Sequence, residues 1–191
     1  DRPLVHFTML RDPVRRVLSY FDYLQTSTGH ALHDKAAARS LEQFVEGRDM
    51  VELANAQTLR ISGNLQKRWW EKTDMEDAFA RAKHSLENHF TLFGLTERYP
   101  EFLIMARQVL GWADIYHQRM NVSQRKTRPE DVPESVLDRI KERNAYDIAL
   151  YDHACGVFEA RCRRLRIGDT KVRSFHERNA AYQELIETGD F

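Results

Sequence analysis

The stretch that decides the fold runs Leu4-Val-His-Phe-Thr-Met-Leu10, then Arg-Asp-Pro, then Val14-Arg-Arg-Val-Leu-Ser-Tyr-Phe-Asp-Tyr-Leu24. Residues 4–10 are mostly apolar, with β-branched and aromatic side chains, which predicts one buried strand. Pro13 cannot continue a strand but suits the first position of a helix, and Asp12 before it is a good N-cap. Residues 14–24 then carry apolar side chains at helical spacing: Val14, Val17, Leu18, Phe21 and Leu24. Arg11 therefore lies where the strand ends, at the edge where open α/β sheets bind ligands.

Arg11 is well suited to bind a phosphate. Its guanidinium is planar and permanently charged, and the N-terminus of a helix favours anions. Ser19 lies two turns into the helix, roughly 10 Å along its axis, and a long arginine side chain covers part of that gap. One phosphate could accept hydrogen bonds from both residues. The alternative is that Arg11 pairs with Asp12 or with a helix C-terminus, and that Ser19 binds nothing.

Three segments resemble sulfotransferases that use 3′-phosphoadenosine-5′-phosphosulfate (PAPS), in the order in which those enzymes carry them. Arg11-Asp-Pro-x-x-Arg-x-x-Ser-Tyr20 resembles their 3′-phosphate-binding segment. Residues 93–99, Phe-Gly-Leu-Thr-Glu-Arg-Tyr, resemble their strand followed by G-x-T-E, and residues 121–127, Asn-Val-Ser-Gln-Arg-Lys-Thr, resemble their basic loop over the nucleotide. The helix after that loop is matched by Asn144, Asp147, Leu150 and Tyr151. The resemblance is to the carbohydrate branch, which includes heparan sulfate 2-O-sulfotransferase.

The resemblance implies an α/β fold of the P-loop-NTPase-like sulfotransferase type, helix-rich, with a parallel sheet flanked by helices. It also implies transfer of a sulfuryl group from PAPS to a hydroxyl of a carbohydrate, by in-line displacement with a general base. Arg11 and Ser19 are expected to hold the 3′-phosphate, and no metal is expected. A second group is expected to close over the nucleotide: Ser123, Arg125, Lys126 and Thr127.

Two parts of such enzymes have no counterpart in these 191 residues. The family's phosphosulfate loop, with its Lys and Ser or Thr, and the base of the carbohydrate branch both precede the Arg-Asp-Pro segment, and only ten residues precede Arg11 here. The pattern G-x-x-x-x-G-K-[ST] occurs nowhere in the sequence. We therefore expect a sulfotransferase-like domain over residues 1–168 that is incomplete at its N-terminus, followed by a helical extension over residues 169–191. No catalytic residue is assigned; His30 and His33 are either substitutes for the base or solvated loop histidines.

Periodicity and capping residues predict the remaining elements. A second strand is expected at residues 90–95, and long helical excursions between strands indicate a parallel sheet. Thr96 is expected to cap the helix after that strand. Helices are expected at residues 41–46, 50–61, 74–88, 97–110, 145–165 and 170–191, with another one after Pro133.

Arg68, Trp69 and Trp70 form a basic and aromatic group that could stack on sugar rings and pair with anionic substituents. The alternative is a tryptophan pair that packs into the core beside solvated charges.

Composition narrows the class of protein. The length fits one domain, and 29 basic residues balance 29 acidic ones, which gives no indication of a nucleic-acid partner. No apolar run approaches the ~20 residues of a membrane span, so membrane attachment would need an anchor in preceding sequence. Cys155 and Cys162, seven residues apart in one predicted helix, are too far apart for a disulfide and favour a reducing compartment. The expected location is the cytoplasm for a bacterial protein or the Golgi lumen for a eukaryotic one, and the sequence does not fix the oligomeric state.

Two functions of other classes stay open at this point. A kinase-like phosphotransferase would share the strand, loop and helix plan, although no Walker-type sequence is present. A non-catalytic nucleotide-binding or protein-interaction module would use the helices and the two tryptophans as a docking surface.

Overall fold

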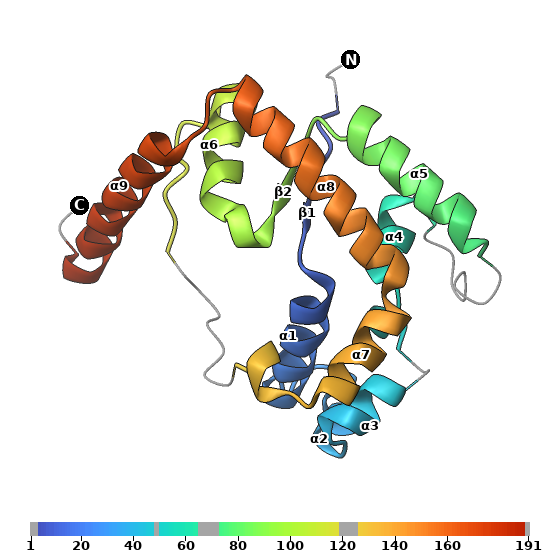
Figure 1. The fold of residues 1–191 in the computed structure, drawn as a ribbon. Coiled ribbons are helices and arrows are strands. Elements are labelled where there is room, and N and C mark those ends of the chain that lie inside the picture. Colours follow the sequence, from blue (N-terminus) through green and yellow to red (C-terminus); the bar gives the residue numbers. More distant parts are fainter. Residues whose placement is uncertain (1–3, 48–49, 65–72, 119–125, 190–191) are drawn as a thin grey trace. The chain divides into compact units, whose positions relative to one another are not determined.

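The computed structural model describes residues 4–47, 50–64, 73–118 and 126–189, which are mostly helical (Figure 1). Contacts between Cα atoms divide the chain into two compact units, each made of separated segments. Unit 1 contains residues 1–10, 89–122 and 155–191, and unit 2 contains residues 11–88 and 123–154. The chain passes from unit 1 to unit 2 between Leu10 and Arg11.

Unit 1 contains the predicted parallel strand pair. Strand β1 (Phe7–Leu10) pairs with β2 (Leu92–Leu95), and the register places Phe7 opposite Leu92 and Leu10 opposite Leu95. All of β2 is buried, and it lies within the residues 90–95 expected for the second strand. In β1 only Leu10 is fully buried, whereas Phe7 is 52% exposed. The expectation of a buried strand over residues 4–10 is therefore wrong for its first part, because the strand begins only at Phe7 and Leu4 and Val5, which precede it, are exposed as well.

Gly94 allows a helix to pack closely on β2. The 3₁₀ turn η3 (Thr96–Arg98) leads into α6 (Tyr99–Leu110), which packs against β2. A Cβ atom at Gly94 would lie 2.5 Å from the sulfur of Met9 and 2.6 Å from the ring of Phe102. Only glycine fits at this point of the strand without displacing one of these side chains.

Thr96 does not cap the following helix, contrary to prediction. Its hydroxyl donates to the backbone carbonyl of Leu10 at 3.0 Å, so it ties the end of β2 to the end of β1. The helix begins after the 3₁₀ turn instead, with Pro100 in its first turn.

Two further helical segments complete unit 1. Helix α9 (Asp169–Thr188) packs against α6, and α8 (Ala145–Arg164) contributes its second half to this unit. In that half, Arg161 stacks over the ring of Phe93 at 4.7 Å, and Cys162 is buried. Cys155 and Cys162 are not joined by a disulfide, and burial raises the pKa of Cys162 to about 11.

Unit 2 is built around helix α1 (Pro13–Thr26), which begins as predicted: the carboxylate of Asp12 accepts the backbone N–H of Arg15 at 2.8 Å. Short elements cover the apolar face of α1. These are α2 (His33–Ala37), α3 (Leu41–Glu46), the 3₁₀ turns η1 (Val51–Leu53) and η4 (Pro129–Asp131), and α7 (Glu134–Arg143). Their shared core includes Val17, Leu18, Phe21, Leu24, Phe44, Leu53, Val136 and Ile140.

The single helix expected over residues 50–61 is wrong. Residues 51–53 form η1, and α4 (Ala56–Ile61) begins only after Asn55, whose φ of 50° and ψ of 34° place it in the left-handed region. A residue in that conformation cannot continue a right-handed helix. Helix α5 (Met75–Asn88) packs on α4, and the carboxylate of Asp74, just before it, accepts the backbone N–H of Glu76 at 3.0 Å.

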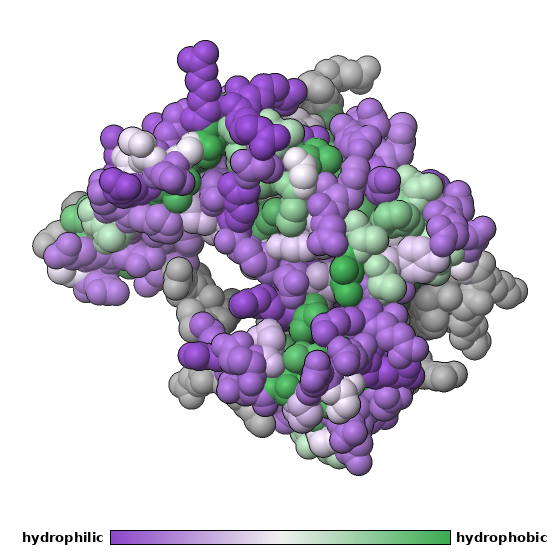
Figure 2. Space-filling view, in the orientation of Figure 1, coloured by the Kyte–Doolittle hydropathy of each residue, from purple (hydrophilic) through white to green (hydrophobic). Residues whose placement is uncertain are grey.

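The surface in view is mostly hydrophilic, with small, separated hydrophobic groups (Figure 2). In the described part of the chain, no helix is both long and apolar enough to cross a membrane.

Candidate functional site

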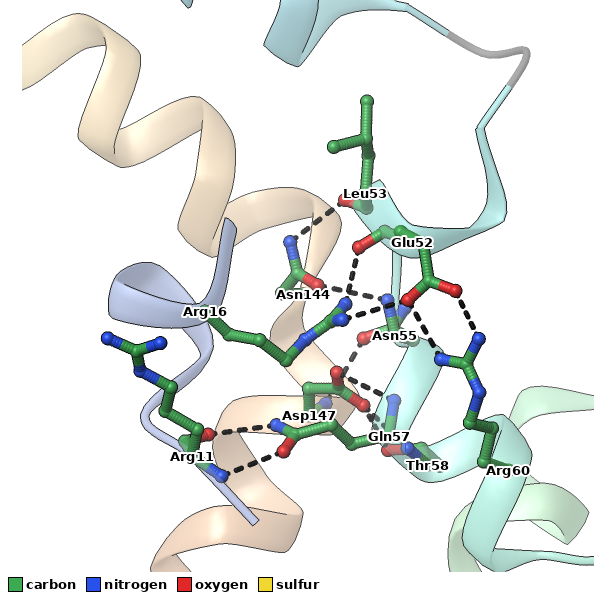
Figure 3. Close-up of polar contacts among 10 residues, drawn as sticks. All are labelled: Arg11, Arg16, Glu52, Leu53, Asn55, Gln57, Thr58, Arg60, Asn144 and Asp147. Carbon is green, nitrogen blue, oxygen red and sulfur yellow. Dashed lines mark hydrogen bonds and ion pairs between the residues drawn. The ribbon is translucent and has the colours of Figure 1, made fainter. Parts of the chain in front are cut away.

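Arg11 is held by the side chain of Gln57, which lies in the first turn of α4. The backbone N–H of Arg11 donates to Oε1 of Gln57 at 2.9 Å, and Nε2 of Gln57 donates to the carbonyl of Arg11 at 2.9 Å. Figure 3 shows the Arg11 guanidinium extending away from Gln57. Its Nε is buried and has no hydrogen-bond partner in the described residues. The backbone of Arg11 is therefore fixed, while its charged group makes no ion pair within the described part of the chain.

The N-terminus of α1 is already occupied by a carboxylate. Asp12 accepts the N–H of Arg15 with its side chain, and its carbonyl accepts the N–H of Arg16. The anion-binding capacity of the helix end is thus partly used within the chain. At the junction of β1 and α1, the group left to bind an external anion is chiefly the guanidinium of Arg11.

A carboxylate between two arginines lies beside this junction (Figure 3). Oε2 of Glu52 accepts from Nη1 of Arg16 at 3.0 Å and from Nη1 of Arg60 at 2.8 Å. Burial of the carboxyl opposes its ionisation, but the hydrogen bonds and charges of Arg60 and Arg16 outweigh this and lower the pKa of Glu52. Bonding to Glu52 raises the pKa of Arg60 in turn. Arg16, the second arginine of the family-like segment, therefore binds Glu52.

Helices α4 and α8 cap each other's N-termini. The carboxylate of Asp147, in the first turn of α8, accepts the backbone N–H groups of Gln57 at 3.1 Å and Thr58 at 2.7 Å, and the Thr58 hydroxyl at 2.7 Å. Oδ1 of Asn55, just before α4, accepts the backbone N–H groups of Tyr146 at 3.0 Å and Asp147 at 3.1 Å. Each side chain satisfies donors that a helix end leaves unpaired.

Asn144 completes this network and is fully buried. Its Oδ1 accepts the backbone N–H of Asn55 at 3.0 Å, and its Nδ2 donates to the carbonyls of Leu53 at 3.0 Å and Ile140 at 2.9 Å. These bonds fix the turn between η1 and α4 against the start of α8. Asn144 and Asp147, two of the residues that carry the family resemblance, are thus structural polar groups inside unit 2.

Asp22 joins the end of the predicted nucleotide loop to α1. The backbone N–H and the hydroxyl of Thr127 donate to the Asp22 carboxylate at 2.7 and 2.6 Å. Asp22 is 4% exposed and lies three residues after the half-buried Ser19, one turn along the same face of α1. Lys126, next to Thr127, is exposed. The structure therefore brings Thr127 to the helix that carries Ser19.

Several predicted site residues lie outside the described residues: Ser123, Arg125, Arg68, Trp69 and Trp70. Of the two histidines expected in a loop, His30 lies in the turn after α1, whereas His33 begins α2. Nδ1 of His33 bonds the carbonyl of Leu24 at 2.7 Å, and Nδ1 of His30 accepts the backbone N–H of Leu32 at 3.1 Å. Their role as a catalytic base stays a prediction. Within the described ranges, no three His, Cys, Asp or Glu side chains are placed to hold a metal.

A cavity of about 290 Å³ lies within unit 1, between α6 and α9. The aromatic rings of Tyr116 and Phe175 line it together with Arg107, Lys171 and Arg178. It contains none of the residues that the sequence singled out.

Sequence reasoning missed Gln57, Glu52 and Asp22. Asp22 could have been found, because it is a charged residue four positions after Leu18 on the apolar face of a predicted helix. Gln57 and Glu52 gave no such signal, since their partners lie 46 and 36 residues away.

Comparison with known proteins identifies the family. A model of the galactose-3-O-sulfotransferase family matches residues 2–188. Galactose-3-O-sulfotransferase 3 of mouse is 29% identical over 98 residues, which is 49% of this chain and 23% of the mouse protein. The bovine and human proteins of that name are each 24% identical, over 81% of this chain and over 38% and 37% of their own lengths. The chain thus spans less than two fifths of these relatives.

These matches confirm the carbohydrate sulfotransferase part of the family prediction, and they do not confirm its heparan sulfate 2-O-like part. The match covers both strands, the Arg-Asp-Pro junction and every helix described above. The chain belongs to the galactose-3-O-sulfotransferase family.

Proposed function

We propose that the protein transfers a sulfuryl group from PAPS to a hydroxyl of a carbohydrate, and that these residues form the part that binds the 3′-phosphate. Arg11 and Ser19 are the proposed contacts. Support comes from the family, and from the position of Arg11 at the junction of β1 and α1.

The observation that carries this proposal is the state of the Arg11 side chain. Leaving a buried donor unpaired costs roughly 1–3 kcal/mol, and Nε of Arg11 is such a donor in the described part of the chain. A phosphoryl oxygen would accept from it and gain a charge-assisted bond. Because Nε of Arg11 has no partner there, no internal hydrogen bond of that atom has to break first.

The second proposed contact group is Ser123, Arg125, Lys126 and Thr127. The bonds from Thr127 to Asp22 support it, since they anchor one end of this segment beside Ser19. Its basic side chains would then close over the nucleotide and add charge-assisted bonds to its 3′-phosphate.

The finer assignments rest on the family. We propose a P-loop-NTPase-like sulfotransferase fold, a division at residue 168, and an acceptor that contains galactose, as the names of the relatives suggest. Arg68, Trp69 and Trp70 are the proposed sugar contacts. The relatives described above are mammalian, which is consistent with the Golgi lumen as location. The catalytic base and the residues that bind the phosphosulfate are not assigned.

Calorimetry with two nucleotides tests the 3′-phosphate site. Adenosine 3′,5′-bisphosphate should bind at least tenfold more tightly than adenosine 5′-monophosphate, the worth of about one charge-assisted bond. Arg11→Ala should abolish that preference, because it removes the guanidinium that reads the extra phosphate. Arg173→Ala, which removes an exposed arginine of α9, is the control and should leave the preference unchanged. Equal affinity of the unaltered protein for the two nucleotides would contradict the proposal.

A further inference from the structure

Arg11 lies in a gap between two regular hydrogen-bond patterns. The pairing of β1 with β2 ends at Leu10, and the first helical bond of α1 runs from the N–H of Arg16 to the carbonyl of Asp12. Neither pattern includes the backbone N–H or carbonyl of Arg11. Both groups are bonded by one side chain, the amide of Gln57, with a donor and an acceptor at 2.9 Å each. Gln57 thus acts on Arg11 as a neighbouring strand would, with two antiparallel bonds.

Gln57 is itself held through its backbone by Asp147. It is 9% exposed, and its own N–H donates to the fully buried carboxylate of Asp147. Thr58 bonds the same carboxylate twice. Bonds therefore run without interruption from the start of α8, through the first turn of α4, to the backbone of Arg11 (Figure 3).

Fixing the backbone fixes the point from which the Arg11 side chain starts. A guanidinium reaches a phosphate with bidentate geometry only if its stem begins in the right place and direction. With the two Gln57 bonds broken, Arg11 would be a single flexible residue between a strand end and a helix cap. Its side chain would still be charged, but it would have to be ordered at the moment of binding, at a cost in affinity.

We propose that Gln57 is the positioning residue of the 3′-phosphate site, acting through the backbone of Arg11, with Asp147 orienting Gln57 from behind. This inference rests on the proposed function, because it assumes that Arg11 binds the phosphate. It assigns a role in nucleotide selectivity to a residue outside all three family-like segments. Gln57 touches no phosphate itself.

Two variants of Gln57 test the inference by calorimetry with adenosine 3′,5′-bisphosphate and adenosine 5′-monophosphate. Gln57→Met keeps the length of the side chain and removes both bonds to Arg11. Gln57→Asn keeps the amide but is too short to bond both backbone groups, and it serves if the Met variant does not fold. Each should lower the preference for the bisphosphate about tenfold and leave the affinity for the monophosphate unchanged. A folding defect would lower both affinities together.

Gln25→Met is the matched control. It makes the same substitution at another glutamine of unit 2, and it removes a bond to the carbonyl of Ala36 but none to Arg11 or Asp147. The preference should survive it. A loss of preference in Gln25→Met equal to that in the Gln57 variants, or an unchanged preference in Gln57→Asn, would overturn the inference.

A double-mutant cycle separates this inference from the proposed function. In an Arg11→Ala background, Gln57→Met should have no further effect on the preference, because Gln57 acts only through Arg11. If the unaltered protein has no preference, the proposed function itself fails. If the preference exists and depends on Arg11 but not on Gln57, the proposed function stands and this inference alone is wrong.

Discussion

Asp22 is a charged side chain on a helix face that is otherwise apolar. Burying a carboxylate is costly unless donors satisfy it, and the backbone N–H and hydroxyl of Thr127 do so here. The two residues are 105 positions apart in the sequence. The bonds to Asp22 therefore hold a segment that is distant in the sequence against α1, close to Ser19, which is proposed to bind phosphate.

Removing either side chain should destabilise the protein by about 1–3 kcal/mol, since a buried polar group then loses a hydrogen bond. Chemical denaturation of Asp22→Ala, Thr127→Val and the double variant measures this. The two effects should not add, because the second change removes a partner that has already lost its bond. Asp152→Ala, on an exposed position of α8, is the control and should change stability by less than about 0.5 kcal/mol. Strictly additive effects would mean that Asp22 and Thr127 do not interact.

Local signals predicted most elements, and long-range contacts account for the errors. The start of α1 followed from Asp12 and Pro13, and α3 has the bounds that were expected, with a capping box of Ser40 and Gln43 at its start. The break at Asn55 was missed, because the bonds that favour it come from the start of α8, about 90 residues later. A periodic apolar pattern over residues 50–61 does not contain that information.

In the candidate site, too, some residues can be predicted from the local sequence and others depend on long-range contacts. Arg11 could be singled out from the sequence, since the residues that place it at the end of a strand are its immediate neighbours. Gln57 could not, because its function depends on which helix end the fold brings to Arg11.

At the level of elements, the close contact between β2 and α6 depends on the lack of a side chain at Gly94. Gly94→Ala should cost about 1–3 kcal/mol, as expected for overpacking a core, because its Cβ would overlap Met9 and Phe102. Gly156→Ala is the matched control: its Cβ would meet nothing within 4 Å, and it lies inside α8. That change should be stabilising by up to about 1 kcal/mol from helix propensity. Thermal unfolding of both variants measures the two changes in stability. Equal changes of the same sign would refute this account of Gly94.

For the molecule as a whole, the described residues that are proposed to contact the nucleotide fall in unit 2. They are Arg11, which is the first residue of that unit, Ser19, Lys126 and Thr127. The described part of the proposed 3′-phosphate site therefore lies within one unit, and the experiments above test that unit.

The 191-residue chain should bind the nucleotide through its 3′-phosphate, and the 5′ group should add little to the affinity. Its sequence contains no phosphosulfate-type loop, so no element of it is assigned to the other end of the nucleotide. Adenosine 3′-monophosphate and adenosine 3′,5′-bisphosphate should then bind with affinities within about twofold of each other. Competition calorimetry measures the ratio. A bisphosphate bound tenfold more tightly would show that these residues also hold the 5′ end.

The exchange of caps between α4 and α8 also has a consequence for how the protein is made. Helix α4 has only six residues, too short to persist alone in water, and the carboxylate that caps it lies about 90 residues downstream. At ordinary translation speeds, roughly 5 to 20 seconds pass between the synthesis of these two parts. During that interval the first half of the nascent chain lacks the carboxylate that caps α4. We expect chaperones to bind it until Asp147 has left the ribosome.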